Sequence, residues 1–310
     1  MKAAQINEYG HADAIKVVEV DQPTINEGQV LIEVQAASLN PFDTMVREGY
    51  LQEMIPLELP ITLGGDIAGV VKEVGAGVDD VAVGDIVYGQ ANVVAGNSGA
   101  LAEYAATKAE QVAKAPTNVD ITEAASLPLV GVSALQAIND HIELKADQKI
   151  FIHGGAGGIG SIAIQLAKNI GAHVATTATG EGTEYVKSLG ADEVIDYKSS
   201  DFSQNLNNYD AVFDTVGGED FNKSFAIIKA GGVAVSMIAD ADEAKAKERD
   251  ITTVKQMTHV TSEKLYELTK LVEDGVVKPN VGKVFDLSDI KQAFEAREAG
   301  QVQGKIVIHM

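Results

Sequence analysis

A glycine-rich loop between two apolar runs is the sequence feature that most constrains the fold of this chain. Residues 149–153 are Lys-Ile-Phe-Ile-His, a short apolar run that is typical of a buried strand. Residues 159–170 repeat apolar side chains at the spacing of one face of a helix. Gly155, Gly157 and Gly160 lie at the junction in the pattern G-x-G-x-x-G. The sequence therefore predicts a strand, a glycine loop and a helix in direct succession.

A loop of this kind suits the pyrophosphate of a dinucleotide. One glycine permits the tight turn, a second lets the backbone approach the pyrophosphate, and a third lets the helix pack closely on the strand. The start of the helix adds unpaired N–H groups and a partial positive charge. A glycine-rich turn without a ligand is the alternative. The residues that we expect to contact the cofactor are Gly155, Ala156, Gly157, Gly158, Ile159 and Gly160.

The end of the next strand, expected at 172–177, bears on which dinucleotide binds. A NAD site has an acidic residue about 20 residues after the glycine loop, but Ala178 and Thr179 occupy that place. The hydroxyls of Thr177 and Thr179 are suited to hydrogen-bond the 2′-phosphate of NADPH. Glu181 lies close by and the loop has no Lys or Arg, which keeps NADH open as the alternative.

Two kinds of pattern divide the chain. Up to about residue 120, short β-rich runs alternate with turns, which is typical of a small β-barrel or a strongly bent sheet. From 121 to 275 strands alternate with helices, which predicts a doubly wound parallel sheet. Residues 276–310 hold further strands, which we expect to return to the first domain. Helices are expected at 159–170, 183–189, 219–229, 261–274 and 288–298.

Charge and composition exclude several classes of function. The chain has 24 Lys and Arg against 45 Asp and Glu, and its net charge of −21 disfavours binding to nucleic acid or anionic membranes. The absence of cysteine excludes disulfides, thiolate nucleophiles and Cys-ligated metals. The six histidines show no ligand spacing, so we expect no metal site. No signal peptide or apolar run of spanning length is evident, which indicates a soluble cytoplasmic protein.

Several spaced motifs carry a resemblance that covers the chain essentially end to end. Besides the glycine loop, they are residues 37–43, 64–71, 83–89, 124–128, 189–192, 214–218 and 304–307. In this order they resemble the zinc-free medium-chain dehydrogenase/reductase superfamily, in its NADPH:quinone oxidoreductase branch. The resemblance implies a GroES-like catalytic domain formed by residues 1–120 and 276–310. It implies an inserted Rossmann domain at 121–275 that binds NADP, with the nicotinamide in the cleft between the two.

The resemblance also implies roles for individual residues. Asn40, next to Pro41, would face the substrate and the nicotinamide, with Tyr50 as a neighbour. Tyr197 would lie near the 2′-phosphate of the adenosine. A homodimer is implied as well. Three more residues match positions that line the cofactor: Ser133, Val216 and Lys305.

The expected chemistry is hydride transfer without a metal. Zinc-dependent relatives carry Gly-His-Glu where this chain has Gly64, Gly65 and Asp66. Without zinc to polarise a carbonyl, a quinone or an α,β-unsaturated carbonyl compound is the better hydride acceptor. Asn40 and Tyr50 are then the expected catalytic residues, because their N–H and O–H groups can stabilise the negative oxygen. Alternatively, Asn40 caps a turn and Tyr50 only packs.

Two other functions remain open from the sequence. An enoyl-thioester reductase would use the same cofactor and the same kind of activated alkene. A non-catalytic NADPH-binding protein, such as a redox sensor or a structural protein, is the other, because a glycine loop indicates binding and not turnover.

Overall fold

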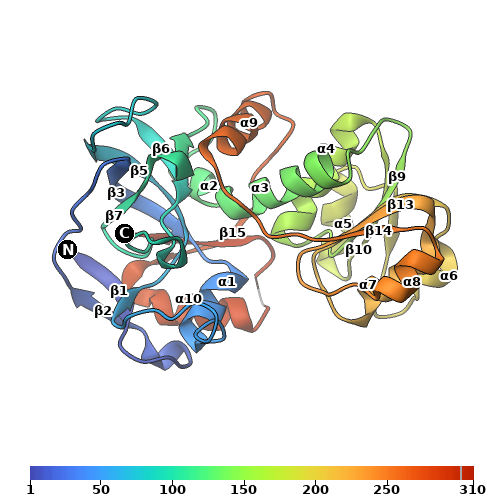
Figure 1. Ribbon diagram of the computed structural model, residues 1–310, viewed down its shortest axis with the longest axis horizontal. Coiled ribbons are helices and arrows are strands. Elements are labelled where there is room, and N and C mark those ends of the chain that lie inside the picture. The colour runs from blue at the N-terminus through green and yellow to red at the C-terminus, as the bar shows by residue number, and fades with distance from the viewer. Residues whose placement is uncertain (301) are drawn as a thin grey trace. The chain divides into compact units, whose positions relative to one another are not determined.

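The computed structural model describes residues 1–300 and 302–310. Its contacts divide the chain into two compact units (Figure 1). The ranges of unit 1 are Met1–Leu129, Val260–Gly275 and Pro279–Met310, and those of unit 2 are Val130–His259 and Val276–Lys278. No helix in the described part of the chain is long and apolar enough to cross a membrane.

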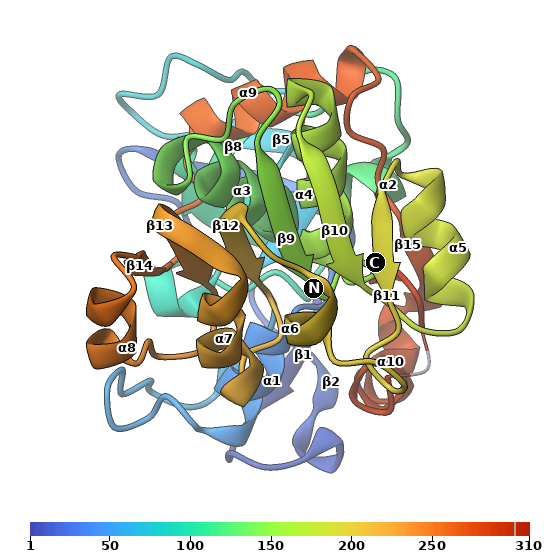
Figure 2. The same ribbon diagram turned by 90° about the vertical axis from the view of Figure 1, so that its right-hand side faces the viewer.

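Unit 2 is built on six parallel strands that lie side by side (Figure 2). They are β9 (Lys149–His153), β10 (His173–Thr177), β11 (Glu193–Ile195), β12 (Tyr209–Asp214), β13 (Ile228–Ser236) and β14 (Thr252–Lys255). Their spatial order is β11-β10-β9-β12-β13-β14, which is 3-2-1-4-5-6 in the order of the chain. This is the Rossmann order, in which a dinucleotide binds where the strand order reverses, here between β9 and β12.

The helices of unit 2 connect these strands. They are α3 (Pro128–Leu135, mostly in this unit), a π-helical segment (Gln136–His141), α4 (Gly158–Ile170), α5 (Glu181–Ser188), α6 (Phe202–Asn205), α7 (Glu219–Lys223) and α8 (Glu243–Glu248). Helix α4 packs on β9 and β10, as its apolar face predicts. Aromatic side chains fill one part of the core, where Phe151, Phe202 and Phe221 are buried together.

One expected helix of unit 2 is shorter than the pattern predicts. The sequence predicts a helix over 219–229, but α7 ends at Lys223 and a 3-10 turn covers Ser224–Ile227. Strand β13 already begins at Ile228, opposite Tyr209 of β12. Pairing with a neighbouring strand thus overrides the apolar spacing that favoured a helix there.

Unit 1 contains a three-stranded and a seven-stranded sheet, which give the GroES-like fold. The small sheet has the order β2 (Lys16–Glu19), β1 (Lys2–Ile6), β4 (Ile61–Thr62). The large sheet has the order β15 (Val281–Asp286), β16 (Lys305–His309), β3 (Gln29–Ser38), β5 (Asp66–Val74), β6 (Ile86–Gln90), β8 (Val112–Lys114), and β7 (Tyr104–Lys108) also pairs with β3. Because β16 pairs with β3, the end of the chain completes a sheet begun near its start.

The helices of unit 1 are α1 (Pro41–Glu48), α2 (Ile121–Ala125), α9 (Ser262–Glu273) and α10 (Ile290–Glu298). Helix α1 is absent from the sequence analysis, which treats the Asn40–Pro41 step only as a possible turn. It begins directly after Asn40, with Pro41 at its first position, where proline has no N–H to lose.

The boundaries of the units differ from the predicted domain boundaries in three segments. Residues 121–129 and 260–275, which are predicted for the second domain, lie in unit 1, and residues 276–278, which are predicted for the first domain, lie in unit 2. The hydroxyl of Tyr88 donates to the carbonyl of Leu265 at 2.6 Å, and Thr269 donates to the carbonyl of Lys114 at 3.1 Å. Helix α9 therefore packs on strands of unit 1. Its apolar pattern predicts a buried face but not the strand that buries it.

Candidate functional site

The glycine loop joins the end of β9 to the start of α4. Gly157 precedes the helix, and its carbonyl accepts the first helical hydrogen bond, from the N–H of Ser161 at 2.9 Å. The N–H groups of Gly158, Ile159 and Gly160 therefore have no carbonyl acceptor within the helix. Such N–H groups at a helix start are the donors that bind phosphate.

The three motif glycines meet different surroundings. A Cβ atom on Gly155 would lie 2.1 Å from the hydroxyl of Thr176, and one on Gly160 would lie 2.3 Å from the carbonyl of Gly154. These two glycines are required by packing inside the protein. On Gly157 the nearest described atom would be the carbonyl of Gly154 at 3.3 Å. No other described atom would lie within 4 Å of that Cβ, so Gly157 is less crowded than Gly155 and Gly160. A less crowded backbone is what close approach of a pyrophosphate requires, so the loop fits a dinucleotide.

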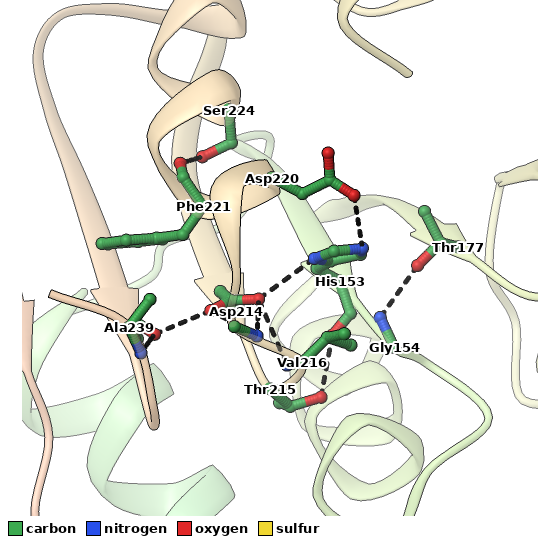
Figure 3. Close-up of polar contacts among 12 residues, drawn as sticks. His153, Gly154, Thr177, Asp214, Thr215, Val216, Asp220, Phe221, Ser224 and Ala239 are labelled. Atoms are coloured by element: carbon green, nitrogen blue, oxygen red, sulfur yellow. Dashed lines mark hydrogen bonds and ion pairs between the residues drawn. The ribbon is translucent and has the colours of Figure 1, made fainter. Parts of the chain in front are cut away.

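Thr177 holds the loop from the end of β10. Its hydroxyl accepts the N–H of Gly154 at 2.9 Å (Figure 3), and its carbonyl accepts the N–H of Gly155 at 3.2 Å. Thr177 is buried, whereas Thr179, two residues later, is partly exposed. The sequence analysis assigns both hydroxyls to a 2′-phosphate. In the structure the hydroxyl of Thr177 also shapes the loop by accepting the N–H of Gly154. The same hydroxyl can still donate its own hydrogen to a ligand.

A second loop packs against the glycine loop. It follows β12, and the hydroxyl of Thr215 donates to the carbonyl of His153 at 2.8 Å (Figure 3). Gly154 adopts a φ of +84°, and a Cβ there would lie 2.7 Å from side-chain atoms of both Thr215 and Val216. Only glycine allows these two loops to approach so closely. Val216, a predicted cofactor residue, lies on this loop with 53% of its surface exposed.

Two other predicted cofactor residues have contrasting surroundings. Ser133 of α3 is fully buried, and its hydroxyl lies 2.7 Å from the hydroxyl of Thr258. Tyr197 lies after β11 with 55% of its surface exposed. The contact of both residues with a cofactor stays a prediction.

Unit 1 contains a buried polar cluster around Asn40. The Nδ2 of Asn40 donates to the carboxylate of Asp66 at 2.8 Å, and its Oδ1 accepts from the ammonium of Lys305. Lys305 also donates to the carbonyl of Leu39 at 2.9 Å and lies 3.7 Å from Asp66. The exposed fractions of Asn40, Asp66 and Lys305 are 2%, 0% and 7%. The two partners fix which way the amide of Asn40 faces.

Burial shifts the pKa of Lys305 in this cluster and of the neighbouring Asp43. Burial lowers the pKa of Lys305, although the carboxylates of Asp66 and Asp43 oppose the effect. Burial, with the nearby charge of Asp66, raises the pKa of Asp43 to about 7, against the opposing hydrogen bond from the N–H of Asn40. The sequence analysis predicts both a catalytic role for Asn40 and a cofactor contact for Lys305. The structure brings these two residues into direct contact.

Tyr50 stands apart from this cluster. It follows the end of α1, where Gly49 reverses the chain, and 69% of its surface is exposed. Its backbone N–H donates to the carbonyl of Met45 at 3.0 Å. The exposure is what a group that meets an incoming substrate needs, but its role as a proton donor stays a prediction.

The comparisons with known proteins agree with this geometry. Two family models match: an alcohol dehydrogenase GroES-like domain at residues 26–117 and a zinc-binding dehydrogenase at residues 189–308. An NADPH-dependent alkenal/one oxidoreductase of Arabidopsis thaliana is 37% identical over 320 residues, covering 100% of this chain and 79% of that protein. This chain belongs to the quinone oxidoreductase-like branch of the medium-chain dehydrogenase/reductase superfamily.

Further relatives support the assignment. A chloroplast envelope quinone oxidoreductase homolog of Arabidopsis thaliana is 33% identical over 324 residues, which cover 99% of this chain and 98% of that protein. The quinone oxidoreductase structure from Coxiella burnetii is 34% identical, with a TM-score of 0.91 and coverage of 100% and 99%. These comparisons confirm the predicted family and the predicted fold class. They also confirm the prediction that this protein is an oxidoreductase. Among residues 1–300 and 302–310, no group of three or more His, Asp or Glu could hold a metal ion.

The space beside Gly157, where an added Cβ would meet only the carbonyl oxygen of Gly154, predicts a loss of cofactor affinity with little loss of stability. In Gly157→Val the branched side chain occupies that space, so we expect the dissociation constant of NADPH to rise by about tenfold or more. In Gly160→Ala the added carbon meets the backbone of Gly154, so we expect a lower melting temperature instead. Fluorescence titration and thermal unfolding measure both. An unchanged affinity in Gly157→Val would refute the loop assignment.

The raised pKa of Asp43 predicts a pH dependence of stability. Above about pH 4 the unfolded chain has released this proton, whereas folded Asp43 keeps it up to about pH 7. Stability therefore falls as pH rises through this window. Relative to Asp43→Asn, the wild type should lose about 2 kcal/mol of unfolding free energy between about pH 5 and pH 7.

A matched control for this pH dependence is Asp201→Asn. Hydrogen bonds and the charge of Lys223 lower the pKa of Asp201 to about 2, so neither the folded nor the unfolded form titrates above about pH 5. Urea unfolding at several pH values should show a constant difference in unfolding free energy between this control and the wild type, because both contain Asp43. The same flat result for Asp43→Asn against the wild type would contradict the assigned charge state.

Proposed function

We propose that this reductase transfers a hydride from NADPH to a quinone or an α,β-unsaturated carbonyl compound. The observation that carries the proposal is the glycine loop, with N–H donors at the start of α4 and a less crowded backbone at Gly157 than at Gly155 and Gly160. It lies at the carboxyl end of β9, beside the place where the strand order reverses. The relatives named above as NADPH-dependent alkenal/one and quinone oxidoreductases support the same cofactor and the same acceptors.

The cofactor would be held mainly by backbone groups. The N–H groups of Gly158, Ile159 and Gly160 would donate to the pyrophosphate. The hydroxyls of Thr177 and Thr179 would donate to the 2′-phosphate, with Tyr197 nearby, as the sequence predicts. Ser133, Val216 and Lys305 complete the proposed set of cofactor residues. When bound, NADPH supplies the hydride.

Asn40 would stabilise the oxygen of the acceptor. An amide nitrogen carries two hydrogens, and the bond to Asp66 uses one of them. Because Lys305 and Asp66 fix the amide, the second hydrogen has a set direction and needs no reorganisation when negative charge develops. Quinones and enones are electron-poor, so the proposed reaction proceeds without zinc. Tyr50 is the proposed proton donor.

The proposal extends to the setting in which the enzyme acts. We propose a cytoplasmic location, as the sequence predicts, and no nucleic acid partner, in accordance with the charge of −21. A homodimer is the proposed assembly, as family resemblance implies. Strand β14 ends the sheet of unit 2, and an end strand is the kind of element through which two copies can pair.

A panel assay tests the reaction and the role of Asn40 together. Oxidation of NADPH and NADH is followed with quinones, enones and enoyl thioesters, for the wild type and for Asn40→Ala. We expect turnover with NADPH and with quinones or enones. We expect Asn40→Ala to lower kcat by about 100-fold, because one oxyanion donor is worth that much, with little change in NADPH affinity.

The control variant is Asn118→Ala, which removes an amide that donates to the carbonyl of Val272 in the same unit. It should keep the wild-type kcat. Equal use of NADH would overturn the cofactor assignment, and turnover with enoyl thioesters alone would replace the acceptor. Cofactor binding without turnover on any acceptor would favour a binding protein. Loss of NADPH affinity in Asn40→Ala with unchanged kcat would remove Asn40 from the catalytic step.

A further inference from the structure

A buried polar network joins the carboxyl ends of three adjacent strands in unit 2 (Figure 3). His153 ends β9, Asp214 ends β12 and Ser236 ends β13. The Nδ1 of His153 lies 3.0 Å from one oxygen of Asp214, and the hydroxyl of Ser236 donates to the other at 2.7 Å. The three residues are 5%, 0% and 0% exposed. One carboxylate thus links the strands on both sides of the point where the strand order reverses.

The same carboxylate shapes the loops that follow these strands. The N–H groups of Val216 and Gly217 donate to Asp214 at 3.2 and 3.1 Å. The hydroxyl of Ser236 in turn accepts the N–H groups of Ile238 and Ala239, at 3.1 and 2.9 Å. The turn 214–217 is therefore folded around Asp214 rather than held by its own backbone.

The hydrogen bonds identify which nitrogen of His153 carries a proton. Burial opposes ionisation of Asp214, but the bonds from His153, Ser236 and the backbone outweigh it and lower its pKa below the usual range. An ionised carboxylate only accepts hydrogen bonds, so the Nδ1 of His153 is the donor. On the other side of the ring, Nε2 faces Asp220 at 4.0 Å, and the ring lies 5.9 Å from the rings of Phe151 and Phe202.

His153 is also tied to the glycine loop. It directly precedes Gly154, and its carbonyl accepts the hydroxyl of Thr215 at 2.8 Å. The backbone of His153 therefore anchors one end of the glycine loop, while its ring holds the carboxylate that shapes the turn 214–217. A shift of this one residue would change the spacing of both loops.

We propose that His153 is a positioning residue for the cofactor: its Nδ1–H holds Asp214, and thereby the turn 214–217, against the glycine loop in the arrangement that binds a dinucleotide. This inference rests on the proposed binding of NADPH and is independent of the acceptor. It assigns a function to one of the six histidines, whose spacing in the sequence predicts only that they do not bind a metal.

Two substitutions separate the hydrogen bond from the packing of the ring. His153→Phe keeps an aromatic ring beside Phe151 and Phe202 but loses the donor. His153→Asn keeps an N–H near the position of Nδ1 but loses the ring. We expect His153→Phe to raise the dissociation constant of NADPH by about tenfold or more. We expect His153→Asn to stay within about threefold of the wild type in affinity, although its melting temperature falls at least as far as that of His153→Phe.

Hydrogen exchange of the cofactor-free protein provides a readout that needs neither cofactor nor turnover. The amides of Val216 and Gly217 should exchange about tenfold faster in His153→Phe than in the wild type, and should return toward the wild-type rate in His153→Asn. The control is His173→Asn. His173 lies at the amino end of β10, away from the loops at the carboxyl ends of the strands, and its Nε2 lies 2.7 Å from the carboxylate of Glu193. It should change neither the exchange rates nor the affinity.

The outcomes distinguish this inference from the proposed function. If His153→Asn weakens NADPH binding and speeds amide exchange as much as His153→Phe does, the hydrogen bond is not what matters. That result would overturn the positioning role. A wild type that binds no dinucleotide would refute the proposed function and this inference's cofactor role, while the exchange rates would still show whether His153 holds the turn.

A measurement on the wild type remains decisive if His153→Phe does not fold. Nitrogen-15 NMR at about pH 7.5 should show His153 with its proton on Nδ1. A neutral ring protonated on Nε2 would contradict the inference.

Discussion

The in-register pairing of β9 with β12 is the constraint on which the rest of unit 2 depends. It places His153 opposite Asp214, so the loops that leave the two strands start side by side. Because β10 and β11 lie on one side of this pair and β13 and β14 on the other, the order in which successive strands are added across the parallel sheet reverses here. The glycine loop and the turn 214–217 are held by hydrogen bonds to His153 and Asp214 at the strand ends. Helix α4 begins directly after the glycine loop. The proposed dinucleotide site is a direct consequence of strand order.

The strongly acidic composition is compatible with the proposed anionic cofactor, because the loop would bind it through backbone groups. The donors proposed for the pyrophosphate are N–H groups at the start of α4, whose partial positive charge does not depend on Lys or Arg. In unit 1 the buried ammonium of Lys305 lies 3.7 Å from the carboxylate of Asp66 and fixes the amide of Asn40. The net charge of −21 is therefore no measure of the charge that a ligand meets locally.

The sequence predicts local units well and the contacts between distant segments poorly. Glycine spacing and helical periodicity predict β9, the loop and α4 almost residue by residue, because those patterns reflect neighbours along the chain. The apolar spacing in the sequence predicts the buried face of α9 equally well. It does not predict that α9 packs beside Tyr88 in unit 1. The pairing of His153 with Asp214 joins residues 61 positions apart and depends on strand order and register, which no local pattern contains.

Hydrogen exchange of the wild type with and without NADPH tests the central claim most directly, because it locates the binding site without any substitution. The claim predicts that NADPH slows the exchange of amides in residues 154–160 and 214–217 together, and leaves β2, in the small sheet of unit 1, unchanged. Protection confined to other segments, or protection of the glycine loop with no change in the turn 214–217, would contradict it.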